Sequence, residues 1–335
     1  MPRGRRDLRQ GGLFDDPESA PATRAVAPAA VPADLADVAR ALPDSIRLGT
    51  SSWSFPGWRG IVYDGVVSEG RLARLGLGAY AKHPLLRTVG IDRTYYAPVA
   101  AATFAAYAAA VPEGFRFLVK AAERCTAPHV RDAAGVMAPN RFYLDPGFAA
   151  GEVVAPLIEG LGAKAGPLVF QFPPQGPRIV ADPARFAETL GAFLRDLPRG
   201  PWYAVELRDR ALLTGAFVGA VASAGATPVV SLHARMPAAT EQYALAAIDP
   251  ERPLVVRWML KAGLAYEDAR VRYAPFSKLV DEDPATRDAL AVLGIAHAQR
   301  ESAVFIVVNN KAEGSAPLTV FRLAQAMVAR LRGSG

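Results

Sequence analysis

Three charged residues stand at the ends of short apolar runs in this chain. Lys120 closes the run 115–120, and Glu206 and Arg208 lie at the end of the run 202–207. Residues two apart on a strand project from the same face. If that face is buried, Arg208 can hold a carboxylate or phosphate with paired donors. Glu206 then suits a general acid or base, and Lys120 can tune its pKa or stabilise an anion. These three are the candidate catalytic residues.

Burial of such charges is costly unless they neutralise one another. A charge network that only closes the fold is therefore the alternative to a reaction centre. More polar and aromatic residues follow the other apolar runs, and they form the candidate ligand-binding set. The set is Trp53, Trp58, Asp92, Tyr95, Tyr96, Gln171, His233, Arg257, Asn309, Asn310, Lys311 and Ser315. Its aromatic members can wall a pocket that stacks a base or sugar, or can simply pack over its mouth.

The segment 309–317 leads directly from an apolar run into a helical pattern. Gly314 permits a tight turn, Ser315 can cap the helix, and Pro317 suits its first turn. Free backbone N–H groups at a helix start favour anions. The segment therefore predicts an anion site, with an ordinary capped helix as the alternative.

Metal and thiol chemistry find little support. The four histidines, at positions 83, 129, 233 and 297, have no ligand-like spacing, so no metal site is predicted. The only cysteine, Cys125, cannot form an intrachain disulfide, which fits a reducing cytoplasm. The residues identify no cofactor.

Eight apolar runs must position these residues. They cover 46–50, 87–91, 115–120, 167–172, 202–207, 227–232, 253–258 and 303–308. Nearly every run is followed by a helical pattern, so the chain is predicted to be α/β, a single (βα)₈ TIM-type barrel. An open doubly wound sheet is the alternative, but no Gly-x-Gly-x-x-Gly turn follows the first run. In a barrel, strand ends and the loops after them form the binding face.

The ends of the chain differ from this alternating region. Residues 1–44 are rich in Pro, Ala and Arg and predict a disordered, flexible tail, with a short helix over 34–42. Residues 45–333 are predicted to form the barrel. Two long excursions, 121–147 and 261–283, leave the carboxyl ends of predicted strands.

Composition limits the partners. The chain has 335 residues and a net charge of +6, which permits contact with DNA, phosphorylated metabolites or anionic surfaces. No apolar stretch is long enough to cross a bilayer, and no signal peptide is evident, so a cytoplasmic protein is expected.

Five segments together resemble the YecE-like family, domain of unknown function number seventy-two. They are IRLGTSSWS at 46–54 with WRG at 58–60, FRFLVK at 115–120, GPLVFQFPP at 166–174, AVELR at 204–208, and NN at 309–310 with GSAP at 314–317. The resemblance implies a TIM-type barrel and supplies no established activity. It also implies likeness to the endonuclease IV and sugar-isomerase barrels, by analogy of fold only.

The chain departs from the family pattern twice. Gly90 and Asp92 stand where the family usually has Glu and Asn in a Val-Glu-Ile-Asn strand end. Met259 stands where the family's Arg-x-His-Gly has its histidine. A mechanism that needs that Glu or His is in doubt here.

A short motif in the predicted tail suggests a partner. Gln10, Leu13 and Phe14 resemble the Gln-x-x-Leu-Phe peptide by which bacterial repair and replication proteins dock on the sliding clamp. A docking peptide must lie in a flexible segment, as this one is expected to.

Three functions fit these observations. The first is a nucleic-acid-associated enzyme, such as a phosphodiesterase-like repair hydrolase, that binds an anionic or phosphate-bearing ligand at the carboxyl face of the barrel. The second is a small-molecule isomerase, lyase or hydrolase acting on a phosphorylated or carboxylated sugar. The third is a non-catalytic binding module that uses the same cleft.

Overall fold

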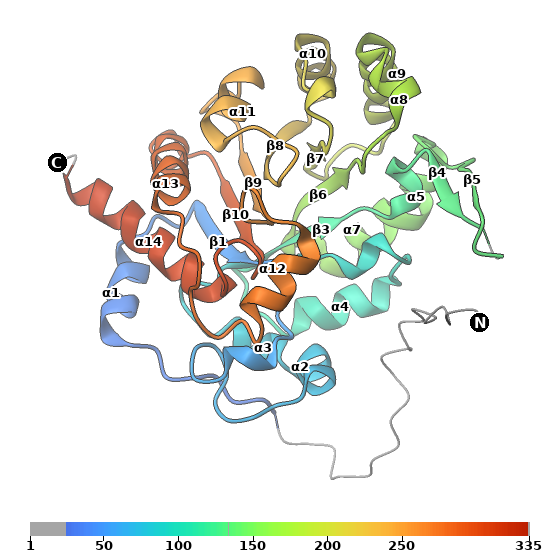
Figure 1. Cartoon of the computed structure of the whole chain (residues 1–335). Helices are drawn as coiled ribbons and strands as arrows, with labels where there is room; N and C mark the ends of the chain where they lie inside the picture. Colours follow the sequence, from blue (N-terminus) through green and yellow to red (C-terminus); the bar gives the residue numbers. More distant parts are fainter. Residues whose placement is uncertain (1–24, 133, 334–335) are drawn as a thin grey trace, which may run out of the picture.

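Eight parallel strands close into a barrel in the computed structural model, which describes residues 25–132 and 134–333 (Figure 1). The strands are β1 (Ile46–Thr50), β2 (Thr88–Ile91), β3 (Arg116–Lys120), β6 (Ala165–Gln171), β7 (Tyr203–Glu206), β8 (Thr227–Leu232), β9 (Leu254–Trp258) and β10 (Val304–Val308). Their order around the barrel is β1-β10-β9-β8-β7-β6-β3-β2, and β2 pairs with β1 to close it. The predicted TIM-type barrel is confirmed, because each strand begins and ends within two residues of its predicted run.

Helices connect the strands and surround the barrel (Figure 1). The α-helices are α1 (Ala33–Ala41), α2 (Glu69–Leu75), α3 (Leu77–Tyr80), α4 (Ala101–Ala109), α5 (Glu123–Thr126), α6 (Pro146–Ala149), α7 (Ala155–Leu161), α8 (Pro177–Val180), α9 (Pro183–Arg195), α10 (Gly215–Ser223), α11 (Ala239–Leu245), α12 (Tyr266–Tyr273), α13 (Pro284–Ala298) and α14 (Ala316–Gly333). Short 3₁₀ turns cover Pro56–Trp58, Arg93–Tyr95, Gly162–Lys164 and Arg210–Leu212, and a π turn covers Ala150–Val154.

Two of the long helices begin with the same local signal. Asp182 precedes α9 and Asp283 precedes α13, and each is followed by proline. Each Asp carboxylate accepts a 3.0 Å hydrogen bond from the backbone N–H three residues further on. Proline at the first helical position loses no hydrogen bond and has its φ already set. The chain therefore enters both helices at a fixed residue.

An apolar layer fills the interior of the barrel. It consists of Leu118, Val169, Ala204, Val229, Val255 and Val307, one residue from each of six strands. The remaining two strands carry glycine at the matching register, Gly49 beside Val307 and Gly90 beside Leu118. A Cβ on Gly49 would lie 1.8 Å from the carbonyl oxygen of Thr88, so β1 and β2 can approach only because this residue has no side chain. The layer forms an apolar floor under the carboxyl ends of the strands.

The predicted flexible tail over residues 1–44 is wrong for residues 25–44, which pack on the barrel. Within them the predicted short helix is present as α1 (Ala33–Ala41), and it buries Leu35 and Ala39. The carbonyls at its end accept hydrogen bonds from the Arg87 guanidinium, at 2.7 Å for Ala39 and 3.2 Å for Leu42. Apolar burial and capping together hold the segment. The predicted clamp-docking residues Gln10, Leu13 and Phe14 lie outside the described residues.

The two long excursions contain structure of their own. The first carries an antiparallel hairpin, β4 (His129–Arg131) with β5 (Met137–Pro139), which Figure 1 places at the edge of the molecule. The second carries α12, which buries Ala269 and Tyr273 against Leu260. Among the described residues, no helix combines the length and the apolar character that crossing a membrane requires.

Candidate functional site

A polar layer lies directly above the apolar floor of the barrel. Each member lies two residues after a residue of the apolar layer, or after Gly49 or Gly90, and therefore points to the same side of its strand. They are Ser51, Asp92, Lys120, Gln171, Glu206, Ser231, Arg257 and Asn309. Six of the eight belong to the predicted site. Ser51 and Ser231 do not, although both end apolar strands and could have been found by the same rule.

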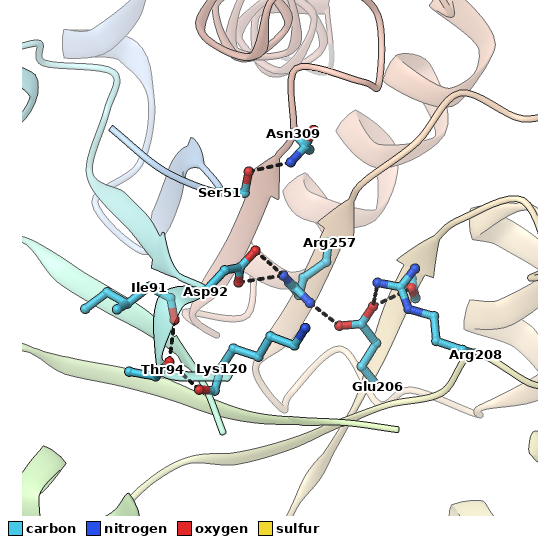
Figure 2. Close-up of polar contacts among 10 residues, drawn as sticks. Ser51, Ile91, Asp92, Thr94, Lys120, Glu206, Arg208, Arg257 and Asn309 are labelled. Carbon is cyan, nitrogen blue, oxygen red and sulfur yellow. Dashed lines mark hydrogen bonds and ion pairs between the residues drawn. The ribbon is translucent and has the colours of Figure 1, made fainter. Parts of the chain in front are cut away.

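Arg257 joins two carboxylates at the centre of this layer (Figure 2). Its guanidinium donates to Glu206 Oε2 at 2.5 Å and to both oxygens of Asp92 at 2.8 and 2.9 Å. Arg208 binds the other oxygen of Glu206 at 2.5 Å, and the Ser231 hydroxyl donates to the same oxygen at 2.7 Å. The charges alternate along the chain Asp92–Arg257–Glu206–Arg208, as a buried network requires.

This alternation sets the charge states of Glu206 and Arg257. Burial raises the pKa of Glu206, but Arg208 and Arg257 outweigh it and bring that pKa to about 2. Burial lowers the pKa of Arg257, and Asp92 and Glu206 more than reverse this, so the guanidinium stays charged. Glu206 is therefore a permanent carboxylate near neutral pH. It acts as a fixed negative charge, and a general-acid role would need its pKa to be far higher.

Lys120 lies beside the network without joining it. Its ammonium lies 3.4 Å from the centre of the Tyr95 ring, and within residues 25–132 and 134–333 it forms no ion pair or hydrogen bond. Figure 2 shows the side chain extending toward the Arg257–Glu206 pair. Burial, followed by the nearby charge of Arg257, lowers the pKa of Lys120 to about 8, against the opposing effect of Asp92 and Glu206.

A cavity of about 440 Å³ opens above the polar layer, and we call it the mouth cavity. Its lining includes the predicted residues Asp92, Tyr96, Lys120, Gln171, Arg208, His233, Arg257 and Asn309. Arg235, Met259 and Tyr266 also line it and were not predicted; the long excursion after β9 is the one sequence signal for Tyr266. His233 keeps a buried Nδ1 that has no hydrogen-bond partner among the described residues. Burial, then Arg208, lowers the pKa of His233 to about 4, so its ring is neutral near pH 7.

A second cavity of about 530 Å³ adjoins the first, and Asp92 borders both. Trp53 and Tyr107 form part of its lining and contact each other edge-to-face at 5.2 Å. Trp53 is thus placed beside the mouth rather than in it. Its indole N–H is buried and has no acceptor in the described part of the chain.

Asn310 and Ser315 lie away from the mouth, in the buried turn before α14, and Trp58 from the 3₁₀ turn Pro56–Trp58 contacts this turn. Asn310 Oδ1 accepts hydrogen bonds from the indole of Trp58 at 3.1 Å and from the Ala316 N–H at 2.8 Å. Ser315 is fully buried. Because protein atoms cover this helix start and the Asn310 side chain bonds to it, the arrangement favours the ordinary capped helix over an anion site.

The remaining predicted residues border the site. The Lys311 ammonium lies 4.0 Å from the centre of the Tyr266 ring. The hydroxyl of Tyr95 is 3.4 Å from Glu123 Oε1, whereas Tyr96 is 83% exposed at the rim. Asn309 donates to the Ser51 hydroxyl at 2.8 Å and so ties β10 to the neighbouring β1 at the mouth.

Neither a metal centre nor a reactive thiol emerges among the described residues. No group of three or more His, Cys, Asp or Glu side chains there is arranged to hold a metal ion. Cys125 is buried, and burial raises the pKa of its thiol to about 12, which keeps it protonated and unreactive.

The fold and the charged mouth define a TIM-type barrel with a ligand-sized cavity at its carboxyl face. The chain belongs to the DUF72 family, described as a protein of unknown function, whose family model matches residues 47–333. This confirms the resemblance found in the sequence, since YecE-like is the same family.

Two solved structures share this fold. A DUF72 family protein from Enterococcus faecalis V583 is 19% identical, with 84% of this chain and 95% of that chain covered and a TM-score of 0.53. A DUF72 family protein from Thermotoga maritima MSB8 is 18% identical, with 84% and 98% covered and a TM-score of 0.52. No curated protein matches this chain.

Proposed function

We propose that the mouth cavity binds a small molecule with a carboxylate or phosphate group, and that the protein is an enzyme acting on that molecule. The observation that carries this is an excess of positive charge around a ligand-sized space. Lys120, Arg208, Arg235 and Arg257 border the cavity, whereas Asp92 and the adjoining Glu206 are the only two carboxylates in the polar layer. An anionic group would restore the balance.

Two donors support the same proposal. Arg208 Nη1 is buried and has no acceptor among the described residues, and Lys120 has no carboxylate partner there. A buried donor without an acceptor costs about 1–3 kcal/mol. A ligand oxygen that accepts from Arg208 would recover part of this cost, and a guanidinium is well shaped for a carboxylate or phosphate.

The size of the cavity favours a small molecule over a nucleic acid. Pockets for small ligands span about 300–1,000 Å³, and about 440 Å³ falls within that range. The substrate class supported best is therefore a phosphorylated or carboxylated sugar or a similar metabolite, with an isomerase, lyase or hydrolase reaction. Binding to DNA remains the competing outcome of the test below.

Calorimetric titration of the full chain tests the proposal. Inorganic phosphate, pyruvate and a panel of sugar phosphates and sugar acids would be added to the wild type, to Arg208→Gln and to the control Arg185→Gln, whose side chain is 71% exposed on α9. We expect at least one probe to bind and to lose about tenfold or more in Arg208→Gln, because a charge-assisted hydrogen bond contributes about 1.5–3 kcal/mol. The control should bind as the wild type does.

Two results would overturn the proposal. One is that no member of the panel binds. The other is tight, steeply salt-dependent binding of an abasic-site duplex that weakens in Lys120→Ala, which would make the nucleic acid the ligand.

A further inference from the structure

Lys120 lines the mouth cavity, and its ammonium forms no ion pair with any described residue. Each carboxylate near it is already occupied: Asp92 gives both oxygens to Arg257, and Glu206 gives one to Arg257 and the other to Arg208 and Ser231. An ammonium at this position gains only the face of the Tyr95 ring, 3.4 Å from its centre. The surroundings therefore favour the neutral amine more than an ordinary lysine site does.

The neutral amine is also the reactive form. With its pKa lowered to about 8 by burial and by Arg257, Lys120 has a free lone pair in a useful fraction of molecules near neutral pH. An ordinary lysine, with a pKa of about 10.4, is almost fully protonated there. Desolvation next to another cationic group is a recognised way to activate a lysine as a nucleophile.

We propose that Lys120 forms an imine with the carbonyl group of a small anionic aldehyde, ketone or keto acid. This inference rests on the proposed function and narrows its substrate class to carbonyl compounds. The amine nitrogen adds to the carbonyl carbon to form a C–N bond, and one of its two protons passes to the oxygen. The C–O bond then breaks, the nitrogen gives up its second proton, and the oxygen leaves as water that carries both protons. No oxidant or reductant is needed.

The neighbouring groups suit such a step. His233 borders the same cavity, and with its pKa lowered to about 4 its neutral ring can carry a proton from the nitrogen to the departing oxygen. Asp92 and Glu206 are the two nearby charges that favour a cation at the Lys120 nitrogen, and they would offset part of the cost of a protonated imine. Arg208 remains to hold the anionic end of the substrate.

Borohydride trapping tests the imine directly. The full chain would be incubated with pyruvate, glyoxylate, glyceraldehyde 3-phosphate or dihydroxyacetone phosphate, reduced with borohydride, and analysed by intact mass and peptide mapping. The chain has six lysines, so the modified residue can be assigned. We expect at least one of these probes to form a single adduct, located on Lys120. The yield of trapped adduct should rise with pH and reach half its maximum at about pH 8.

Matched variants make the assignment firm. Lys120→Met removes the amine and leaves no buried carboxylate without a partner, so it is expected to fold, which circular dichroism would verify. Lys82→Arg removes an exposed lysine outside both cavities and should trap as the wild type does. If Lys120→Met does not fold, the peptide map of the wild type still decides the site.

The outcomes separate this inference from the proposed function. Anion binding without any adduct on Lys120 would overturn the imine and leave the proposed function standing. Adducts spread equally over exposed lysines, or retained in Lys120→Met, would also overturn it. Failure of both the titration and the trapping would overturn both proposals.

Discussion

Glu206 should make the stability of the protein depend on pH in a defined window. On folding, its pKa falls from 4.5 to about 2 through Arg208 and Arg257, which outweigh burial. Each pKa unit corresponds to about 1.4 kcal/mol, so this fully buried carboxylate stabilises the folded state by about 3 kcal/mol. Because the folded pKa is depressed, that contribution is complete above about pH 4.5 and is lost as the pH falls toward about 2.

Glu206→Gln removes the titrating group and leaves two buried guanidinium groups facing a neutral amide. We expect urea denaturation at pH 7 to show a loss of about 3 kcal/mol or more in the free energy of unfolding. At pH 3 the difference between the wild type and the variant should shrink to less than half of that value. Glu188→Gln, in an exposed pair with Arg185 on α9, is the matched control and should change little at either pH.

One result would refute this reasoning. A difference between the wild type and Glu206→Gln that stays constant from pH 7 to pH 3 would mean that the carboxylate does not carry the stability assigned to it. The loss would then come from packing or from a rearranged network, and the assignment of Glu206 as a fixed negative charge would fall with it.

Three further predictions concern the scaffold. His83 stacks on Phe321 at 4.4 Å, and burial lowers the pKa of His83 from 6.5 to about 4. The stability that the neutral ring contributes is therefore complete above pH 6.5 and is lost as the pH falls toward 4. In thermal or urea melts, the free energy of unfolding of His83→Phe should rise by about 2 kcal/mol relative to that of the wild type between pH 7 and pH 5. Gly314 has φ of +118°, and a Cβ there would lie 2.6 Å from the carbonyl oxygen of Lys278. In urea denaturation, Gly314→Ala should therefore lose about 2 kcal/mol of the free energy of unfolding. An unchanged midpoint would show that the alanine is not strained. The hydroxyl of buried Tyr80 donates to the Thr88 carbonyl at 2.9 Å and accepts from the Thr50 N–H at 3.0 Å. Tyr80→Phe should therefore lose about 2 kcal/mol of the free energy of unfolding. A loss below about 0.5 kcal/mol would show that water replaces the hydroxyl.

The barrel could be predicted because its strands are buried on both faces. Runs such as 168–170 and 305–308 are continuously apolar, which leaves few other structures for them. The elements missed have no such pattern. The hairpin β4–β5 consists of two three-residue strands with mostly exposed side chains. Half of the residues of α12 are charged, and the helix buries only Ala269 and Tyr273. The N-terminal segment was missed because its proline content concealed the few apolar residues that dock it.

The site could be predicted only in part because position along the chain does not give the direction of a side chain. Asn309 follows inward-facing Val307 by two residues and reaches the mouth, whereas adjacent Asn310 bonds to Trp58 and to the start of α14. The alternation rule could have separated the two. The ion pair that occupies the Asp92 carboxylate could not have been predicted from the sequence, because its partner Arg257 is 165 residues away.

The polar layer also bears on how the sequence can change over evolution. In every strand, the side chain of the polar layer lies two residues after the residue of the apolar layer. Insertion or loss of one residue within a strand would therefore turn that polar side chain toward the surrounding helices and an apolar side chain toward the ligand. Such a change would remove stability and binding in one step. New specificities can therefore arise readily by exchanging one mouth residue for another or by lengthening the loops beyond it, while the lengths of the strands themselves stay under strong constraint.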